Sequence, residues 1–165
     1  MRFGSFNAHG KETWGLMKDD GAVLVDANTA TSFPNLKSAI ANNSLEKIGA
    51  ELRTKQVDIP VAEISYLPVI SNPDKILCVG LNYHDHRLEG GHKEVGEPTL
   101  FVRFANAQVG HCEAIIAPME SDSLDFEAEL AIIIGKSGRR IPEKEAFNYI
   151  AGYSCYNDGS VREYQ

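Results

Sequence analysis

The sequence predicts an α+β fold that is rich in β-structure, and three observations lead to this prediction. Short apolar runs with β-branched and aromatic residues are separated by Gly, Pro and Asp-Gly signals, which is typical of strands and hairpins. Helical periodicity is confined to short stretches, of which residues 35–53 are the clearest. The chain of 165 residues is 43% hydrophobic, which is enough to build a buried core.

Composition narrows the classes of function. The formal net charge of -7 argues against nucleic-acid binding, which needs clustered Lys and Arg. The sequence has neither an apolar run of membrane-spanning length nor a signal peptide, so we expect a cytoplasmic protein that does not insert into a membrane. Its three widely spaced cysteines predict neither a disulfide framework nor a metal knuckle. An anionic small-molecule substrate would need a metal or specific arginines as a local positive centre.

Residues 1–68 are predicted to form a small α+β domain. Asp-Gly at positions 20–21 indicates a hairpin, Pro60, Pro68 and Pro73 interrupt the connector, and we place the domain boundary near Pro68. The expected elements are strands at 2–8, 13–18 and 22–26, a polar loop at 28–34, one or two helices within 35–53, and a strand at 64–69. No residue of this domain suggests chemistry.

Residues 69–165 are predicted to form a second, β-rich domain. It begins with a short buried-strand pattern that ends at Gly80 and is followed by a polar cluster, an arrangement in which sites are often built. The expected elements are strands at 75–80, 99–104, 114–118, 125–134 and 151–156, and a short helix at 141–150 with Pro142 in its first turn.

Glu127 and Glu129 are the first candidate site residues. Residues two apart in a strand point to the same face, so the two carboxylates lie side by side. One interpretation is the solvated face of an amphipathic strand. The other is a site for a hard divalent cation, because the same face continues into the apolar Ala131 and Ile133, and crowded carboxylates near a core need a partner.

His86 and Glu89 are the second pair. One helical turn would place them on one face, where the carboxylate orients the imidazole as in a general-base dyad, although a solvated turn of helix has the same pattern. His84, His86 and His92 offer a rival zinc site, for which no fourth ligand is suitably spaced.

Asp158 follows the predicted strand 151–156 in an Asp-Gly pair. The pair by itself indicates a turn. Its carboxylate could also be the third oxygen ligand that completes a facial site with Glu127 and Glu129.

Four segments together resemble the fumarylacetoacetate hydrolase family, in motif order and in intervening length. They are residues 80–89 (Gly-Leu-Asn-Tyr-His-Asp-His-Arg-Leu-Glu), 125–131 (Asp-Phe-Glu-Ala-Glu-Leu-Ala), 151–153 (Ala-Gly-Tyr) and 157–162 (Asn-Asp-Gly-Ser-Val-Arg). The resemblance covers residues 70–165 strongly, and residues 1–68 loosely resemble the N-terminal domain of bacterial members.

The resemblance implies a β-roll of mixed sheets that forms homodimers and binds Mg²⁺, Mn²⁺ or Ca²⁺. Family metal ligands match Glu127, Glu129 and Asp158, and the family's proton-transferring dyad matches His86 and Glu89. The residues that match substrate contacts are Tyr83, Arg162 and Gln165.

The implied reaction is metal-dependent cleavage of a C–C bond in a 2,4-diketo acid. An alternative is isomerisation or decarboxylation of a 2-hydroxy-dienoic diacid. Family members usually continue well beyond Gln165 and contribute a further lysine, so we expect an incomplete roll with exposed apolar edges. A second alternative is therefore a catalytically silent metal-binding or dimerising module.

Overall fold

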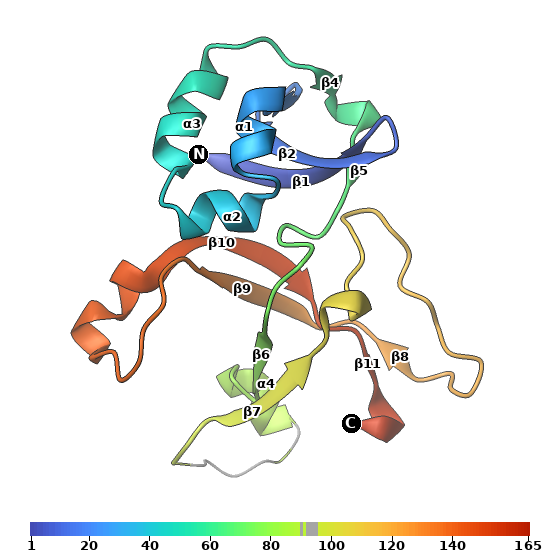
Figure 1. The fold of residues 1–165 in the computed structure, drawn as a ribbon. Coiled ribbons are helices and arrows are strands. Elements are labelled where there is room, and N and C mark those ends of the chain that lie inside the picture. The colour runs from blue at the N-terminus through green and yellow to red at the C-terminus, as the bar shows by residue number, and fades with distance from the viewer. Residues whose placement is uncertain (90, 92–95) are drawn as a thin grey trace. The chain divides into compact units, whose positions relative to one another are not determined.

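A computed structural model describes residues 1–89, 91 and 96–165, except for the side chains of His86 and Glu89. The chain forms two compact units, one made of residues 1–70 with 109–165 and the other of residues 71–108. The α+β, β-rich class predicted from the sequence is confirmed (Figure 1). Within the described residues, no helix combines the length and the apolar character needed to cross a bilayer.

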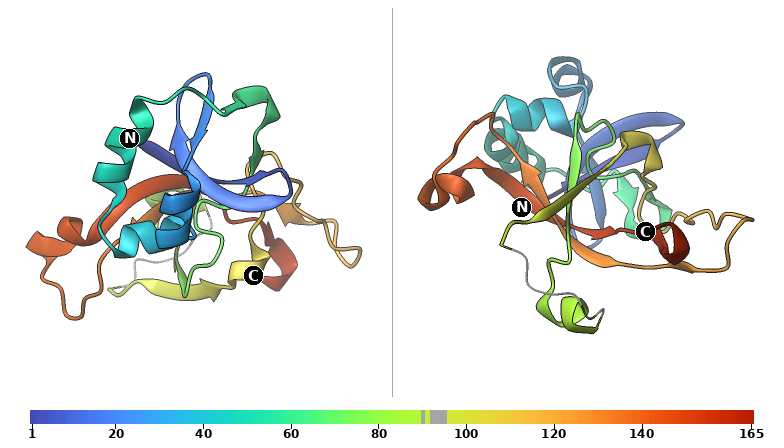
Figure 2. Two further views of the ribbon diagram at one scale, coloured as in Figure 1. Left: turned by 45° about the horizontal axis from the view of Figure 1, so that its top comes forward. Right: turned by 90° about the horizontal axis from the view of Figure 1, so that it is seen from below.

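The N-terminal part of the first unit contains a five-stranded antiparallel sheet in the order β4-β3-β2-β1-β5. Its strands are β1 (Arg2–Ala8), β2 (Lys11–Met17), β3 (Gly21–Leu24), β4 (Ile59–Pro60) and β5 (Ser65–Tyr66). Three helices lie together beside these strands (Figure 2), namely α1 (Ala27–Ser32), α2 (Leu36–Ala41) and α3 (Leu45–Arg53). A 3₁₀ turn, η1 (Val61–Glu63), separates β4 from β5.

Apolar side chains of this sheet and these helices form one buried cluster. At its centre Trp14 is fully buried, and its indole N–H donates to the Phe33 carbonyl over 2.9 Å. A buried tryptophan needs such an acceptor for its N–H. The buried members are Trp14, Leu16, Val23, Val25, Leu36, Ala39, Ile48 and Leu52.

Residues 28–34 were predicted to be a polar loop, but most of them belong to helix α1. The carboxylate of Asp26 accepts the backbone N–H of Thr29 over 2.9 Å and caps the first turn. This N–H, followed by the nearby Lys55, holds the pKa of Asp26 below its usual range. The Phe33 N–H closes the other end on the Thr29 carbonyl. A short helix that is stabilised by a side-chain cap can form without the apolar periodicity that was used to predict helices.

The C-terminal part of the first unit contains two antiparallel ladders. Strand β9 (Ala128–Ile134) pairs with β10 (Ile150–Asn157), and β8 (Leu124–Asp125) pairs with β11 (Ser160–Val161). The helix predicted at 141–150 is the 3₁₀ segment η3 (Glu143–Tyr149), and η4 (Arg162–Tyr164) follows β11. The prediction of a strand at 114–118 was wrong. In the described part of the chain these residues join no ladder, and Ile116 is 88% exposed.

The second unit consists of residues 71–108. Strands β6 (Ile76–Gly80) and β7 (Thr99–Arg103) form an antiparallel pair, with α4 (His84–Glu89) between them in the chain and the 3₁₀ turn η2 (Ala105–Ala107) after them. The first strand was predicted to be buried, yet Leu77 and Val79 are 61% and 45% exposed. A two-stranded ribbon with one short helix offers too little surface to bury them.

Candidate functional site

Glu127 lies at the break between the two C-terminal ladders. The β9–β10 ladder ends at the pair Ala128 and Asn157, and the β8–β11 ladder resumes at the pair Asp125 and Ser160. Across this gap the Asp158 N–H donates to the Glu127 carbonyl over 2.9 Å. The Glu127 N–H donates to the Asn157 side-chain oxygen over 3.0 Å. These two bonds hold Glu127 opposite Asn157 and Asp158.

Glu129 is the second residue of β9 and pairs with Tyr156 of β10. Burial alternates along the strand, with Glu129, Ala131 and Ile133 on the more buried side. Leu130, Ile132 and Ile134 on the other side are 50–63% exposed. The predicted shared face of Glu129 with Ala131 and Ile133 is therefore observed.

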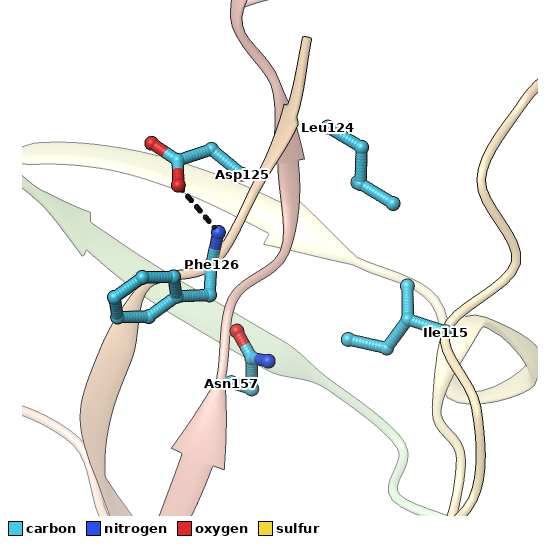
Figure 3. A pocket seen from close by; sticks show the side chains of 5 residues that line it. All are labelled: Ile115, Leu124, Asp125, Phe126 and Asn157. Atoms are coloured by element: carbon cyan, nitrogen blue, oxygen red, sulfur yellow. Dashed lines mark hydrogen bonds between the residues drawn. The ribbon is translucent and has the colours of Figure 1, made fainter. Parts of the chain in front are cut away.

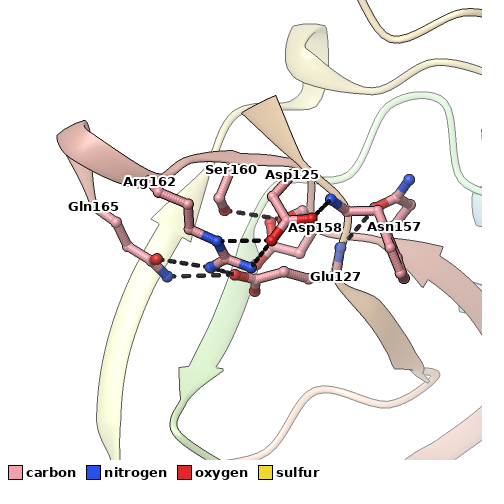
Figure 4. A network of polar contacts seen from close by, with 8 residues as sticks. Asp125, Glu127, Asn157, Asp158, Ser160, Arg162 and Gln165 are labelled. Atoms are coloured by element: carbon pink, nitrogen blue, oxygen red, sulfur yellow. Dashed lines mark hydrogen bonds and ion pairs between the residues drawn. The ribbon is translucent and has the colours of Figure 1, made fainter. Parts of the chain in front are cut away.

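Arg162 is the centre of a polar network that includes Glu127 (Figure 4). Its Nε and Nη2 donate to Asp125 Oδ2 over 3.1 and 2.9 Å. Its Nη1 donates to the carboxylate of Glu127 and, over 2.8 Å, to Gln165 Oε1. The Gln165 amide nitrogen donates in turn to Glu127 over 3.4 Å. The network forms because η4 begins directly after β11 and places Arg162 and Gln165 one turn apart.

The network is partly shielded from solvent and strongly charged. The side chain of Glu127 is 16% exposed and that of Arg162 is 33% exposed. Asp158 is 4% exposed and is the one buried carboxylate among the described residues. The guanidinium of Arg162, followed by the Phe126 N–H, lowers the pKa of Asp125. Asp125, followed by Glu127, raises the pKa of Arg162, so this pair stays ionised at neutral pH.

The predicted metal ligands form a suitable donor set that is not gathered in this conformation. Three carboxylates are the oxygen ligands that a hard divalent cation prefers, and the ladder break brings the backbones of Glu127 and Asp158 together. In the part of the chain that the structure describes, no three His, Cys, Asp or Glu groups are placed to hold a metal ion. The Glu127 carboxylate is directed to Arg162, and its Oε1 accepts from Arg162 and from Gln165.

The other predicted residues belong to the second unit. Helix α4 contains His86 and Glu89 three positions apart, as expected, but their side chains lie outside the described residues. Tyr83 precedes the helix and is 45% exposed. Of the rival zinc site, His84 is exposed and lies 3.3 Å from Asp85, while His92 is also outside the described residues. The dyad and the zinc site therefore stay predictions.

Two residues of the network were not identified from the sequence. Asp125 lies two residues before Glu127 and four before Glu129, and this spacing of two is the signal that would have indicated a shared strand face. Asn157 directly precedes Asp158, but nothing in the sequence indicates that its amide oxygen accepts a bond from a residue thirty positions away.

An open pocket of about 260 Å³ lies beside the ladder break (Figure 3). Three of its lining side chains are apolar and two are polar. The lining residues are Ile115, Leu124, Asp125, Phe126 and Asn157.

Residues 75–165 match the family model described as the fumarylacetoacetate (FAA) hydrolase C-terminal domain. Oxaloacetate tautomerase fahd2, mitochondrial, of Xenopus laevis is 36% identical over 157 residues, which covers 92% of this chain and 49% of the relative. Oxaloacetate tautomerase Fahd2a, mitochondrial, of Rattus norvegicus is 38% identical over 155 residues, covering 92% and 50%. The chain thus spans about half the length of the curated relatives it matches.

Solved structures share the fold. A probable 2-hydroxyhepta-2,4-diene-1,7-dioate isomerase from Mycobacterium abscessus matches with a TM-score of 0.71 at 26% identity, covering 99% of this chain and 54% of that one. Maleylpyruvate hydrolase from Sphingobium sp. SYK-6, in complex with manganese(II) and pyruvate, matches with a TM-score of 0.78 at 22% identity, covering 98% and 60%. The second likeness is a likeness of fold alone.

Proposed function

Because the chain belongs to the fumarylacetoacetate hydrolase family, we propose that it is part of an enzyme that converts a small 2-oxo acid through its enol form. The observation that carries this proposal is the network at the ladder break. It combines a cationic side chain, Arg162, with the carboxylates of Asp125 and Glu127, next to the backbone of Asp158, in a chain whose net charge is -7. A fixed guanidinium in an acidic protein is suited to bind the carboxylate of an anionic substrate.

We propose that Glu127, Glu129 and Asp158 hold a divalent cation, Mg²⁺ or Mn²⁺. Such a cation would stabilise the negative charge that develops on the 2-oxo oxygen during enolisation. Arg162 and Gln165 would orient the substrate carboxylate, and the pocket beside Asp125 would hold the remainder of the molecule. His86, oriented by Glu89, would move the proton between carbon and solvent.

Among the reactions that pass through an enol, tautomerisation of a 2-oxo diacid is the first candidate. Curated relatives from Xenopus laevis and Rattus norvegicus are named oxaloacetate tautomerases and cover nine-tenths of this chain. Cleavage of a C–C bond in a 2,4-diketo acid is the second candidate. It is favoured by the spacing of His86 and Glu89 on α4, since hydrolysis also needs an activated water.

A tautomerase assay tests the proposal. The decay of enol-oxaloacetate absorbance is followed with the chain plus Mg²⁺ or Mn²⁺, and with the same metal concentration without protein, because free cations also promote enolisation. We expect acceleration by the wild-type chain and none by Glu127→Ala. An acylpyruvate assay with the same variants separates the second candidate. Metal binding without turnover in either assay would instead favour the silent module.

A further inference from the structure

We propose that Asp125 is a positioning residue, which holds the guanidinium of Arg162 in the orientation that receives the substrate carboxylate. This role in substrate binding rests on the function proposed above. The orientation itself is a property of the chain and can be measured independently.

The carboxylate of Asp125 is fixed through both of its oxygens. Oδ1 accepts the backbone N–H of Phe126 over 2.9 Å, and Oδ2 accepts Nε and Nη2 of Arg162 over 3.1 and 2.9 Å. Pairing of β8 with β11 places Asp125 opposite Ser160, two residues before Arg162. The register of this strand pair therefore determines that the carboxylate of Asp125 contacts Nε and Nη2 of Arg162.

This contact fixes which end of the guanidinium faces Glu127 and Gln165, and a substrate carboxylate would take over one of their bonds to Nη1. With Nε and Nη2 directed at Asp125, Nη1 is directed at Glu127 and Gln165 (Figure 4). Without Asp125 the long side chain would sample several rotamers, and a ligand would have to order it on binding. It would also be free to turn its whole guanidinium toward Glu127.

Stability is a minor part of this role. The side chains of Asp125 and Arg162 are 48% and 33% exposed, and ion pairs in contact with solvent add little to folding stability. Asp125 has two opposing effects on anion binding, since it orders Arg162 and also offsets its charge. If charge alone mattered, removing Asp125 would strengthen the binding of an anion. Positioning predicts the opposite sign.

The first measurement is the ¹H–¹⁵N signal of the Arg162 Nε–H group in the full chain, identified by its absence in Arg162→Lys. We expect a sharp, slowly exchanging signal in the wild type, loss of it in Asp125→Ala, and partial retention in Asp125→Asn, whose amide oxygen still accepts. An unchanged signal in Asp125→Ala would overturn the proposal.

The second measurement is oxalate binding by calorimetry in the presence of Mg²⁺. We expect Asp125→Ala to weaken oxalate binding roughly threefold to tenfold, which is the cost of ordering one long side chain. Asp125→Asn should be affected less, and Asp125→Ala should have no further effect in an Arg162→Ala background. Equal or tighter oxalate binding by Asp125→Ala would overturn the positioning role. If the wild type binds no oxalate while the Nε–H signal responds as expected, the proposed function fails and the orientation of Arg162 by Asp125 stands.

Discussion

At the scale of the residue, Glu127 is held through its backbone and its side chain by different partners. Asn157 and Asp158 bond its N–H and carbonyl, whereas Arg162 and Gln165 bond its carboxylate. The backbone bonds replace the ladder bonds that are missing at the break. The side-chain bonds of Glu127 are separate from these backbone bonds.

The Asn157 side chain gives a prediction at this scale. Asn157→Ala removes the acceptor of the Glu127 N–H at the end of the β9–β10 ladder, so we expect the free energy of unfolding to fall by about 0.5–1.5 kcal/mol. Urea denaturation measures this change. Asn148→Ala, at an exposed position in η3, is the matched control and should stay within about 0.5 kcal/mol of the wild type. Equal stability of the two variants would contradict the backbone role of Asn157.

Motif spacing identified some of these residues and missed others for a physical reason. Glu127, Arg162 and Gln165 were predicted as site residues, and the structure brings them into contact. The contacts of Asp125 with Arg162 and of Asn157 with Glu127 depend on the register between strands 30 or more residues apart. Register follows from pairing in three dimensions, which side-chain chemistry along one segment does not reveal.

At the scale of the element, regular alternation was predictable and single turns were not. The strands at 2–8 and 150–157 follow their sequence patterns closely. Helix α1 was missed because one side-chain cap, rather than periodicity, stabilises it. Residues 114–118 have strand-like composition, but a strand forms only where a partner is available to bond its backbone.

The β9–β10 ladder also shows what alternation leaves undecided. The sequence pattern assigned the residues of β9 to the two faces of the strand as observed. However, Leu130, Ile132 and Ile134 are exposed, as is Tyr153 on the neighbouring strand. Their apolar character indicates a face suited to packing, while burial depends on which other elements are present to cover it.

At the scale of the whole molecule, the buried core lies within the N-terminal residues. Among the described residues, every buried apolar side chain falls between Phe6 and Leu52. Val69 and Ile70 pack against the same cluster, and the Ser5 hydroxyl donates to the Val69 carbonyl over 3.0 Å. The predicted boundary near Pro68, with residues 1–68 as a separate domain, stays a prediction.

A fragment of residues 1–70 tests the predicted boundary. Trp14 is the one tryptophan of the chain and is fully buried, so its fluorescence reports directly on this core. We expect the fragment to unfold cooperatively in urea and, before unfolding, to show the same blue-shifted emission as the full chain. Leu52→Ala in the fragment should lower the free energy of unfolding by about 2–5 kcal/mol. Emission typical of solvent-exposed tryptophan without denaturant would contradict an independent N-terminal domain.

Binding of Mn²⁺ to the full chain tests the proposal that Glu127 and Asp158 at the ladder break hold a divalent cation. Electron paramagnetic resonance measures free Mn²⁺ as the protein is titrated. We expect stoichiometric binding by the wild type and by Glu120→Gln, an exposed control, and loss of binding in the double variant Glu127→Gln with Asp158→Asn. No binding by the wild type, or equal binding by the double variant, would contradict it.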